Sequence, residues 1–116
     1  MNALVNNMDP HPEPDLNAAL NQLWLRFRSN LIERVSTLES AAAAFADQKL
    51  SREQQEAAFA AAHNLAGVLG TFAMEHGTVL AHQLEMLFGF ARRPNRQLAE
   101  RLCSISAELR ALIESR

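Results

Sequence analysis

Apolar residues recur at alternating steps of three and four along four stretches of this chain. This spacing places side chains on one face of a helix, so the pattern predicts four amphipathic helices. No stretch alternates with period two, and we expect no strands. The four stripes are Leu20, Trp24, Phe27, Leu31, Val35, Leu38, Ala42 and Phe45; Ala58, Ala62, Leu65, Leu69 and Phe72; Gly77, Leu80, Ala81, Leu84, Leu87 and Phe88; and Leu98, Leu102, Ile105, Leu109 and Leu112.

Local signals mark where these helices begin and end. Asp15 is a plausible N-cap of the first helix, and Ser51 followed by Gln54 forms a capping-box pattern for the second. Gly89 and then Pro94 mark the end of the third helix. The helices are therefore joined by short connections, which favours antiparallel neighbours.

The pattern predicts an all-α fold, an antiparallel up-down-up-down four-helix bundle. Residues 1–14 are rich in Asn and Pro, and we expect them to form a flexible leader. Residues 15–116 form the bundle domain. A short extra N-terminal helix, bending near Trp24, is an alternative to a plain leader.

Composition excludes several classes of function. The chain has 116 residues, a formal net charge of −2 and one cysteine, Cys103. The absence of a basic surplus argues against binding to nucleic acid or to an anionic membrane. A single cysteine excludes an internal disulfide, and no apolar run is long enough to span a bilayer. Since the start of the chain also lacks a secretory signal pattern, we expect a cytoplasmic protein.

One histidine in the second predicted helix points away from the apolar stripe. On a helical wheel His63 lies about 140° from the centre of that stripe, with Gly67 and Gly70 in the same outward sector. Ala60 and Ala66 lie in this sector or at its edge, and Asn64 follows the histidine directly. Because glycine inside a helix costs about 1 kcal/mol relative to alanine, two of them here suggest that another molecule approaches the imidazole.

The chemistry that suits this arrangement is nucleophilic attack by a lone imidazole. The sequence has neither a nucleophile elbow nor a Gly-rich phosphate loop. Neutral imidazole is a good nucleophile near pH 7 and can attack a phosphoryl group that another protein has activated. Small neighbouring residues would permit the close approach that in-line transfer requires.

The order of these residues resembles the histidine phosphotransfer (HPt) domain family. The matching residues are His63, Leu65, Gly67, Gly70, Thr71 and Phe72, followed by Leu80, Ala81, His82, Leu84 and Glu85. The likeness covers residues 51–88 by motif and the flanking helices by pattern only. It implies a helical bundle in which His63 is the phospho-acceptor, usually through Nε2. The chain would then be a covalent phosphoryl carrier rather than an enzyme that turns over.

The resemblance also implies partners and departs from the family pattern in three places. It implies a response-regulator receiver domain, a histidine kinase or both as partners, with no cofactor on this chain and Mg²⁺ on the receiver. Ala66 stands where the family usually has lysine, Val68 replaces a small polar residue, and Ala73 replaces a glycine. The loss of the lysine leaves open a module that binds a receiver or kinase without accepting phosphate. The third reading is a structural or dimerisation bundle whose histidine is incidental, which a large apolar surface patch and a buried His63 would support.

The remaining candidates have structural explanations. His82 precedes Glu85 by three residues, which predicts a local ion pair or hydrogen bond. We place His76 in a turn between helices and expect no metal site. Cys103 is expected to be a partly buried thiol, and Trp24 and Phe27 are expected in the core.

Overall fold

A computed structural model describes residues 15–90 and 93–116. Within these residues the chain forms four helices and no strand, which confirms the all-α prediction. The helices are α1 (Leu16–Ala46), α2 (Arg52–Thr71), α3 (Glu75–Gly89) and α4 (Arg96–Ser115). The predicted leader, residues 1–14, lies outside the described residues.

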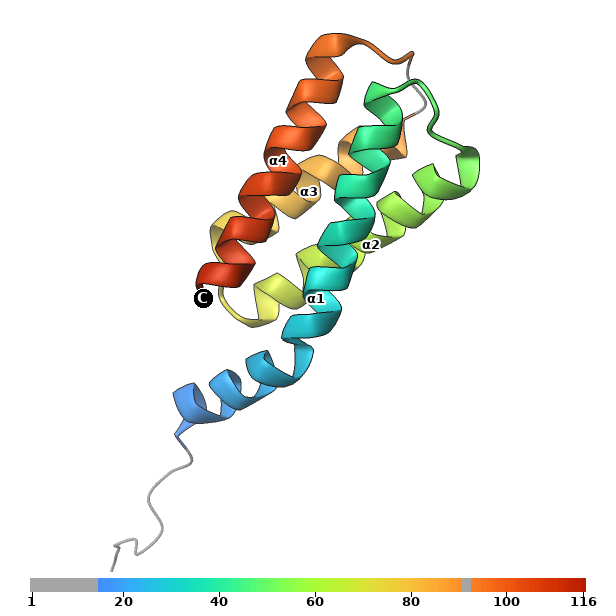
Figure 1. Ribbon diagram of the computed structural model, residues 1–116. Helices are drawn as coiled ribbons and strands as arrows, with labels where there is room; N and C mark the ends of the chain where they lie inside the picture. The colour runs from blue at the N-terminus through green and yellow to red at the C-terminus, as the bar shows by residue number, and fades with distance from the viewer. Residues whose placement is uncertain (1–14, 91–92) are drawn as a thin grey trace, which may run out of the picture.

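The helices form an antiparallel bundle in which each packs against the next along the chain and α4 closes against α1 (Figure 1). The contact between α2 and α3 is the most extensive, followed by that between α1 and α4. The core is built almost wholly from the predicted stripes, with leucine and alanine as its main components. The bundle thus places α2 and α3 side by side, and the outward sector of α2 is left free.

The first helix is longer than the others and extends beyond them. Figure 1 shows that its N-terminal turns project past the end of the bundle, at an angle to the rest of α1. The oxygen of the Asp15 side chain accepts hydrogen bonds from the backbone N–H groups of Asn17 and Ala18, as its expected N-cap role requires. Leu16–Ala46 is one continuous helix rather than a short and a long one, and its N-terminal turns are bent relative to the rest, as one alternative expected (Figure 1).

At the base of the bundle, Trp24 is buried and Phe27 is not. The ring of Trp24 meets that of Phe72 edge to face at 5.2 Å, and the guanidinium of Arg116 lies 4.8 Å from the Trp24 ring centre. Phe27 is 44% exposed, so its expected place in the core is wrong.

Two helices end in the same hydrogen-bonded motif with a left-handed residue. After α1, Gln48 has φ of 58°, and after α2, Ala73 also has φ of 58°. At the end of α2, Ala73 N–H donates to the carbonyl of Gly70 and Met74 N–H to that of Leu69, the pattern of a Schellman motif. Neither residue is the glycine that this conformation favours, so both ends carry backbone strain.

An ion pair joins the first and last helices. The Arg110 guanidinium donates two hydrogen bonds to the Glu39 carboxylate, at 2.8 and 2.9 Å, and one to the hydroxyl of Ser36. The carboxylates of Glu39 and Glu114 raise the pKa of Arg110 above its usual range. Because the two-pronged geometry fixes both side chains, this pair sets the register between α4 and α1.

Candidate functional site

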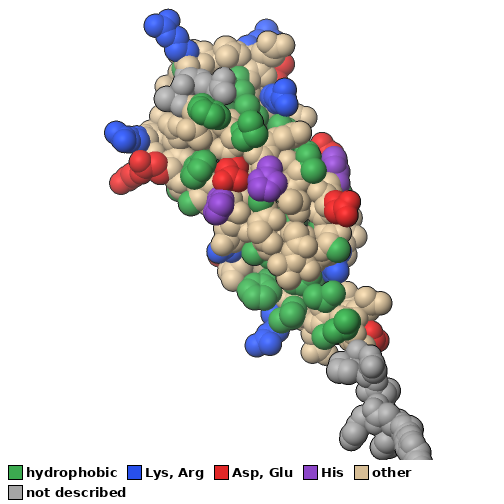
Figure 2. Space-filling view, turned by 180° about the vertical axis from the view of Figure 1, so that it is seen from behind, with side chains coloured by type: hydrophobic (Ala, Val, Ile, Leu, Met, Phe, Trp, Pro, Cys, Tyr) green, Lys and Arg blue, Asp and Glu red, His purple; other side chains and the backbone are tan. Residues whose placement is uncertain are grey.

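His63 lies on the outer face of α2 and is open to solvent. Its side chain is 73% exposed, while Ala62 and Leu65 on the opposite side of the helix are buried in the core. Histidine and acidic side chains lie next to one another on this face of the molecule (Figure 2). The predicted outward direction of the imidazole is therefore confirmed, and the burial of His63 that would have supported a structural or dimerisation bundle is not found.

The neighbouring helix supplies a carboxylate that orients this imidazole. Nδ1 of His63 lies 2.7 Å from Oε2 of Glu85 in α3. A carboxylate can only accept a hydrogen bond, so the neutral ring carries its proton on Nδ1 and its lone pair on Nε2. Among the residues that the structure describes, none bonds to Nε2. The exposed nitrogen is therefore the nucleophilic one.

The carboxylate of Glu85 lies within hydrogen-bonding distance of two histidines. Its second oxygen, Oε1, lies 3.2 Å from Nδ1 of His82, one turn earlier on α3, as the spacing of these two residues predicted. The hydrogen bond from His63 and, more weakly, that from His82 lower the pKa of the Glu85 carboxyl from its ordinary value of 4.5, against an opposing effect of burial. Glu85 is thus a charged acceptor at neutral pH.

The sequence alone did not reveal the bond between His63 and Glu85. The two residues are 22 positions apart on different helices, so no helical periodicity connects them. The available signal was that both lie at outward positions of helices expected to be neighbours. Whether two such residues meet depends on how closely the two helices pack and on how each is rotated about its axis. In this structure, the packing of α3 on α2 brings Glu85 to His63.

Packing within the bundle does not require glycine at either of the two positions beside His63. A Cβ atom added to Gly67 would meet nothing within 4 Å, and one added to Gly70 would meet only the Thr78 hydroxyl, at 3.8 Å. Gly77 differs, because a Cβ there would lie 3.1 Å from Cδ1 of Leu69 in the core. Folding therefore explains the absence of a side chain at Gly77 but leaves it unexplained at Gly67 and Gly70.

The other residues expected around the imidazole divide into two groups. Ala60 and Asn64 are exposed on α2, as expected. Ala66 is only 5% exposed, so its expected place on the outer surface is wrong. It lies at the flank of the α2 stripe and belongs to the buried core. Ala66 therefore cannot touch a docked molecule through its own methyl group.

His63 has no positively charged side chain bonded to it within the described residues. Among the described residues, no lysine or arginine bonds to His63 or to Glu85. Arg52 lies on the same side of α2, about three turns before the histidine, and pairs with Glu56 at 3.4 Å. A phosphoryl group on His63 would lie beyond the screening length of that guanidinium, about 8 Å at physiological salt.

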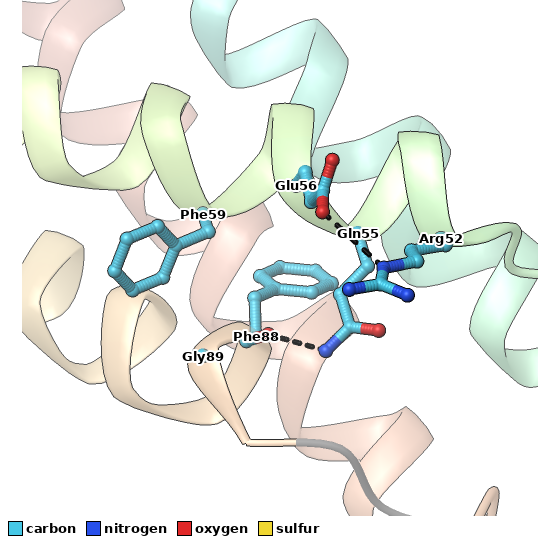
Figure 3. Close-up of a pocket in the computed structure, with 6 residues that line it drawn as sticks. All are labelled: Arg52, Gln55, Glu56, Phe59, Phe88 and Gly89. Carbon is cyan, nitrogen blue, oxygen red and sulfur yellow. Dashed lines mark hydrogen bonds and ion pairs between the residues drawn. The ribbon is translucent and has the colours of Figure 1, made fainter.

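A hollow of about 570 Å³ lies between the first half of α2 and the end of α3 (Figure 3). The Gln55 side-chain amide donates to the carbonyl of Phe88 at 2.8 Å and joins the two helices there. The ring of Phe59 lies over Gly89, where an added Cβ would come within 2.9 Å of it. The hollow begins one turn from His63, since Phe59 precedes the histidine by four residues.

The remaining polar candidates lie away from His63. Nε2 of His76, which belongs to the first turn of α3 rather than to a turn between helices, lies 2.6 Å from Oε2 of Glu108 in α4. Cys103 is exposed, so its expected partial burial is wrong. In residues 15–90 and 93–116, no group of three or more His, Cys, Asp or Glu side chains could hold a metal ion.

The Hpt domain family matches residues 22–115, most of the chain. The protein therefore belongs to the Hpt domain family, and domains of this family transfer phosphoryl groups in phosphorelays together with receiver domains and kinases. No curated protein and no solved structure matched the chain. No helix in the described part of the chain has the length and apolar character needed to cross a membrane.

Proposed function

We propose that His63 of this domain accepts a phosphoryl group on Nε2 from the aspartate of a receiver domain, or from a kinase, and passes it on. The observation that carries this proposal is the exposed imidazole whose other nitrogen, Nδ1, is held at 2.7 Å by Glu85. This arrangement leaves the Nε2 lone pair directed outward and available. No other histidine of the described chain is both bonded through Nδ1 at so short a distance and flanked by glycines on its helix.

The transfer balances without a further reactant. The Nε2 lone pair attacks phosphorus, a P–N bond forms, and the P–O bond to the partner's aspartate breaks and returns a carboxylate. The ring becomes positively charged and keeps its proton on Nδ1. Glu85 stabilises that charge through the hydrogen bond already in place, so the ring does not have to reorient as it reacts.

The glycines provide room for the partner. In-line attack needs the reacting atoms within about 3–3.5 Å of each other, which brings the partner's surface against α2. Gly67 and Gly70 lie one and two turns beyond His63 on its exposed side, and the bundle does not fill the space above Gly67. A surface without side chains there suits a second protein that must approach the helix backbone.

The partner must also supply the positive charge. Glu85 beside His63 is negative, and no cation of the described chain bonds to either residue, so the transferred phosphoryl group finds no neutralising charge on this domain. We expect that charge, including Mg²⁺, on the receiver, and we propose no cofactor on this chain. We likewise propose that the protein acts as a cytoplasmic phosphoprotein.

The test is phosphorylation by a phosphorylated receiver, followed by analysis of the labelled residue. We expect an acid-labile, base-stable label that is lost in His63→Gln. His76→Gln is the matched control, because His76 is also exposed and bonded to a carboxylate, through Nε2. A label that persists in His63→Gln and disappears in His76→Gln would move the acceptor and overturn the proposal.

The same experiment separates the second candidate function, a module that only binds. Ala66, in place of the usual lysine, and the lack of a cation bonded to His63 favour that candidate. It predicts receiver binding that is unchanged in His63→Ala and no label in the unaltered protein. Transfer to His63 would exclude it.

A further inference from the structure

The projecting end of α1 carries a row of apolar side chains that the described part of the bundle covers only in part. Leu16, Leu20, Leu23 and Phe27, here called the α1 seam, follow one another at steps of four, three and four residues. Leu20 is half-buried, and the other three are exposed. Figure 2 shows hydrophobic side chains gathered at this end of the molecule. The seam spans about 16 Å of helix, or three turns.

The exposed apolar side chains of this segment would gain stability from a partner. Helical segments of fewer than about 12–15 residues are only marginally stable in water, and most helices gain their stability from packing of an apolar face. Within the bundle, Trp24 holds the segment through Phe72 and Arg116, on a side about 70° from the seam. Leu20 packs against the core, whereas Leu16, Leu23 and Phe27 remain exposed to another molecule.

We propose that the α1 seam pairs with the seam of a second copy of this chain, in antiparallel orientation. The order of steps, four-three-four, reads the same in both directions. An antiparallel pair therefore sets Leu16 level with Phe27 of the second copy and Leu20 level with Leu23. Each of the four seam residues of one copy then faces an apolar residue of the other. This is the self-complementary arrangement that a two-fold axis requires.

Charge favours the antiparallel orientation over the parallel one. Arg26 and Arg28 lie at one end of the segment, Asp15 lies at the other, and no acidic residue occurs between Leu16 and Ile32. A parallel pair would set the arginines of both copies level with each other. The antiparallel pair sets them level with the acidic end of the second copy, and it also opposes the two helix dipoles.

The pairing is compatible with phosphotransfer and is weak. The seam lies at the far end of α1, whereas His63 lies about 13 Å along α2 from Phe72 at the base of the bundle, so its face remains free. Stable interfaces cover about 800 Å² on each partner, and a seam of three turns covers less. We expect a dissociation constant of about 10 µM or weaker.

The test is sedimentation equilibrium of the full chain over about a hundredfold range of concentration. Leu23→Asp should raise the dissociation constant of the dimer at least about tenfold. The matched control is Leu25→Asp, because Leu25 lies on the same segment and is 73% exposed but points about 170° from the seam. It should shift the constant by less than about twofold. Thermal unfolding followed by circular dichroism checks that both variants remain folded.

Disulfide trapping tests the orientation, with Cys103→Ser as the background. A mixture of Leu16→Cys and Phe27→Cys chains should form the mixed disulfide, and Phe27→Cys alone should form no disulfide-linked dimer. Equal trapping of Phe27→Cys with itself would show a parallel pair and overturn the orientation. The proposal is overturned if the unaltered chain stays monomeric throughout. It is also overturned if Leu23→Asp leaves the mass unchanged but weakens receiver binding, which would assign the seam to the receiver.

Discussion

Nδ1 of His63 and Oε2 of Glu85 lie 2.7 Å apart, across the contact between α2 and α3. The side chain of His63 is largely exposed while that of Glu85 is mostly covered, so a largely buried carboxylate orients an imidazole that is open to solvent. The helix pair therefore acts as the support that selects one tautomer of an exposed ring. The proposed reactivity of His63 therefore depends on a residue of a different helix.

Replacement of Glu85 should slow phosphorylation of His63. Glu85→Gln keeps an acceptor oxygen but removes the charge that stabilises the reacting ring. A hydrogen bond to a charged group contributes about 1.5–3 kcal/mol, and because this site is open to water we expect the lower part of that range, about a tenfold loss of rate. The measurement is the rate of labelling by phosphoramidate, a small donor that needs no docking. His82→Gln is the control and should change the rate by less than about twofold; equal rates in the chain and Glu85→Gln would contradict the assigned role.

The Glu85 carboxyl should make folding stability depend on pH. Its pKa is lowered in the folded chain, chiefly by the hydrogen bond from His63, so folding is stabilised by its ionised form. This contribution is fully present above the unfolded value of 4.5 and is lost as pH falls through the lower folded value. Urea unfolding at pH 6 and pH 3 measures the effect. The stability difference between the unaltered chain and Glu85→Gln should shrink at pH 3, and a constant difference would contradict the assignment.

Substitutions at Gly67 should separate stability from transfer. Gly67→Ala adds a methyl group that meets nothing within 4 Å, so we expect the free energy of unfolding to rise by about 0.5–1 kcal/mol. Gly67→Gln should keep most of that gain but slow transfer from a receiver at least about tenfold, while leaving phosphoramidate labelling unchanged. Gly77→Ala is the control for internal crowding and should not stabilise the chain, because Leu69 lies 3.1 Å from the added atom. Unimpaired transfer in Gly67→Gln would show that no partner approaches there.

The ion pair between Arg110 and Glu39 should contribute more to stability than a surface pair within one helix. Arg110→Ala removes two short hydrogen bonds to a half-buried carboxylate, and we expect a loss of about 1 kcal/mol. Arg96→Ala, which removes an exposed pair with Glu100, should cost about 0.5 kcal/mol or less. Urea unfolding of both variants gives the comparison. Equal losses would mean that the α1–α4 contact does not depend on this pair.

The sequence predicted the helices well because their signals are local. The capping box at Ser51 and Gln54 and the cap at Asp15 form as their spacing requires. The stripe of the first helix failed only at Phe27, which is 44% exposed although Trp24, one turn earlier, is buried. The sequence pattern of a helix indicates which of its faces is apolar, but it does not indicate how much of that face the other helices of the bundle cover.

The site was predictable up to the contact between helices. The outward direction of His63 follows from the wheel, because a single helix fixes it. Ala66 was misplaced because its burial depends on how closely the other helices approach that flank, and the bond to Glu85 was missed for the same reason. Distances between helices are set by all the side chains of the contact together, so spacing in one helix cannot supply them.

The left-handed residue that follows α2 should respond to glycine with a gain in stability. Ala73 has φ of 58° and occupies the position of a Schellman motif that favours glycine, so Ala73→Gly relieves strain of about 1 kcal/mol. Ala107 is the matched control, because it is exposed in the interior of α4, where the same substitution should cost about 1 kcal/mol. Urea unfolding of the two variants should therefore give shifts of opposite sign. A loss of stability in Ala73→Gly would show that the connection between α2 and α3 is held by the Ala73 side chain rather than by its backbone conformation.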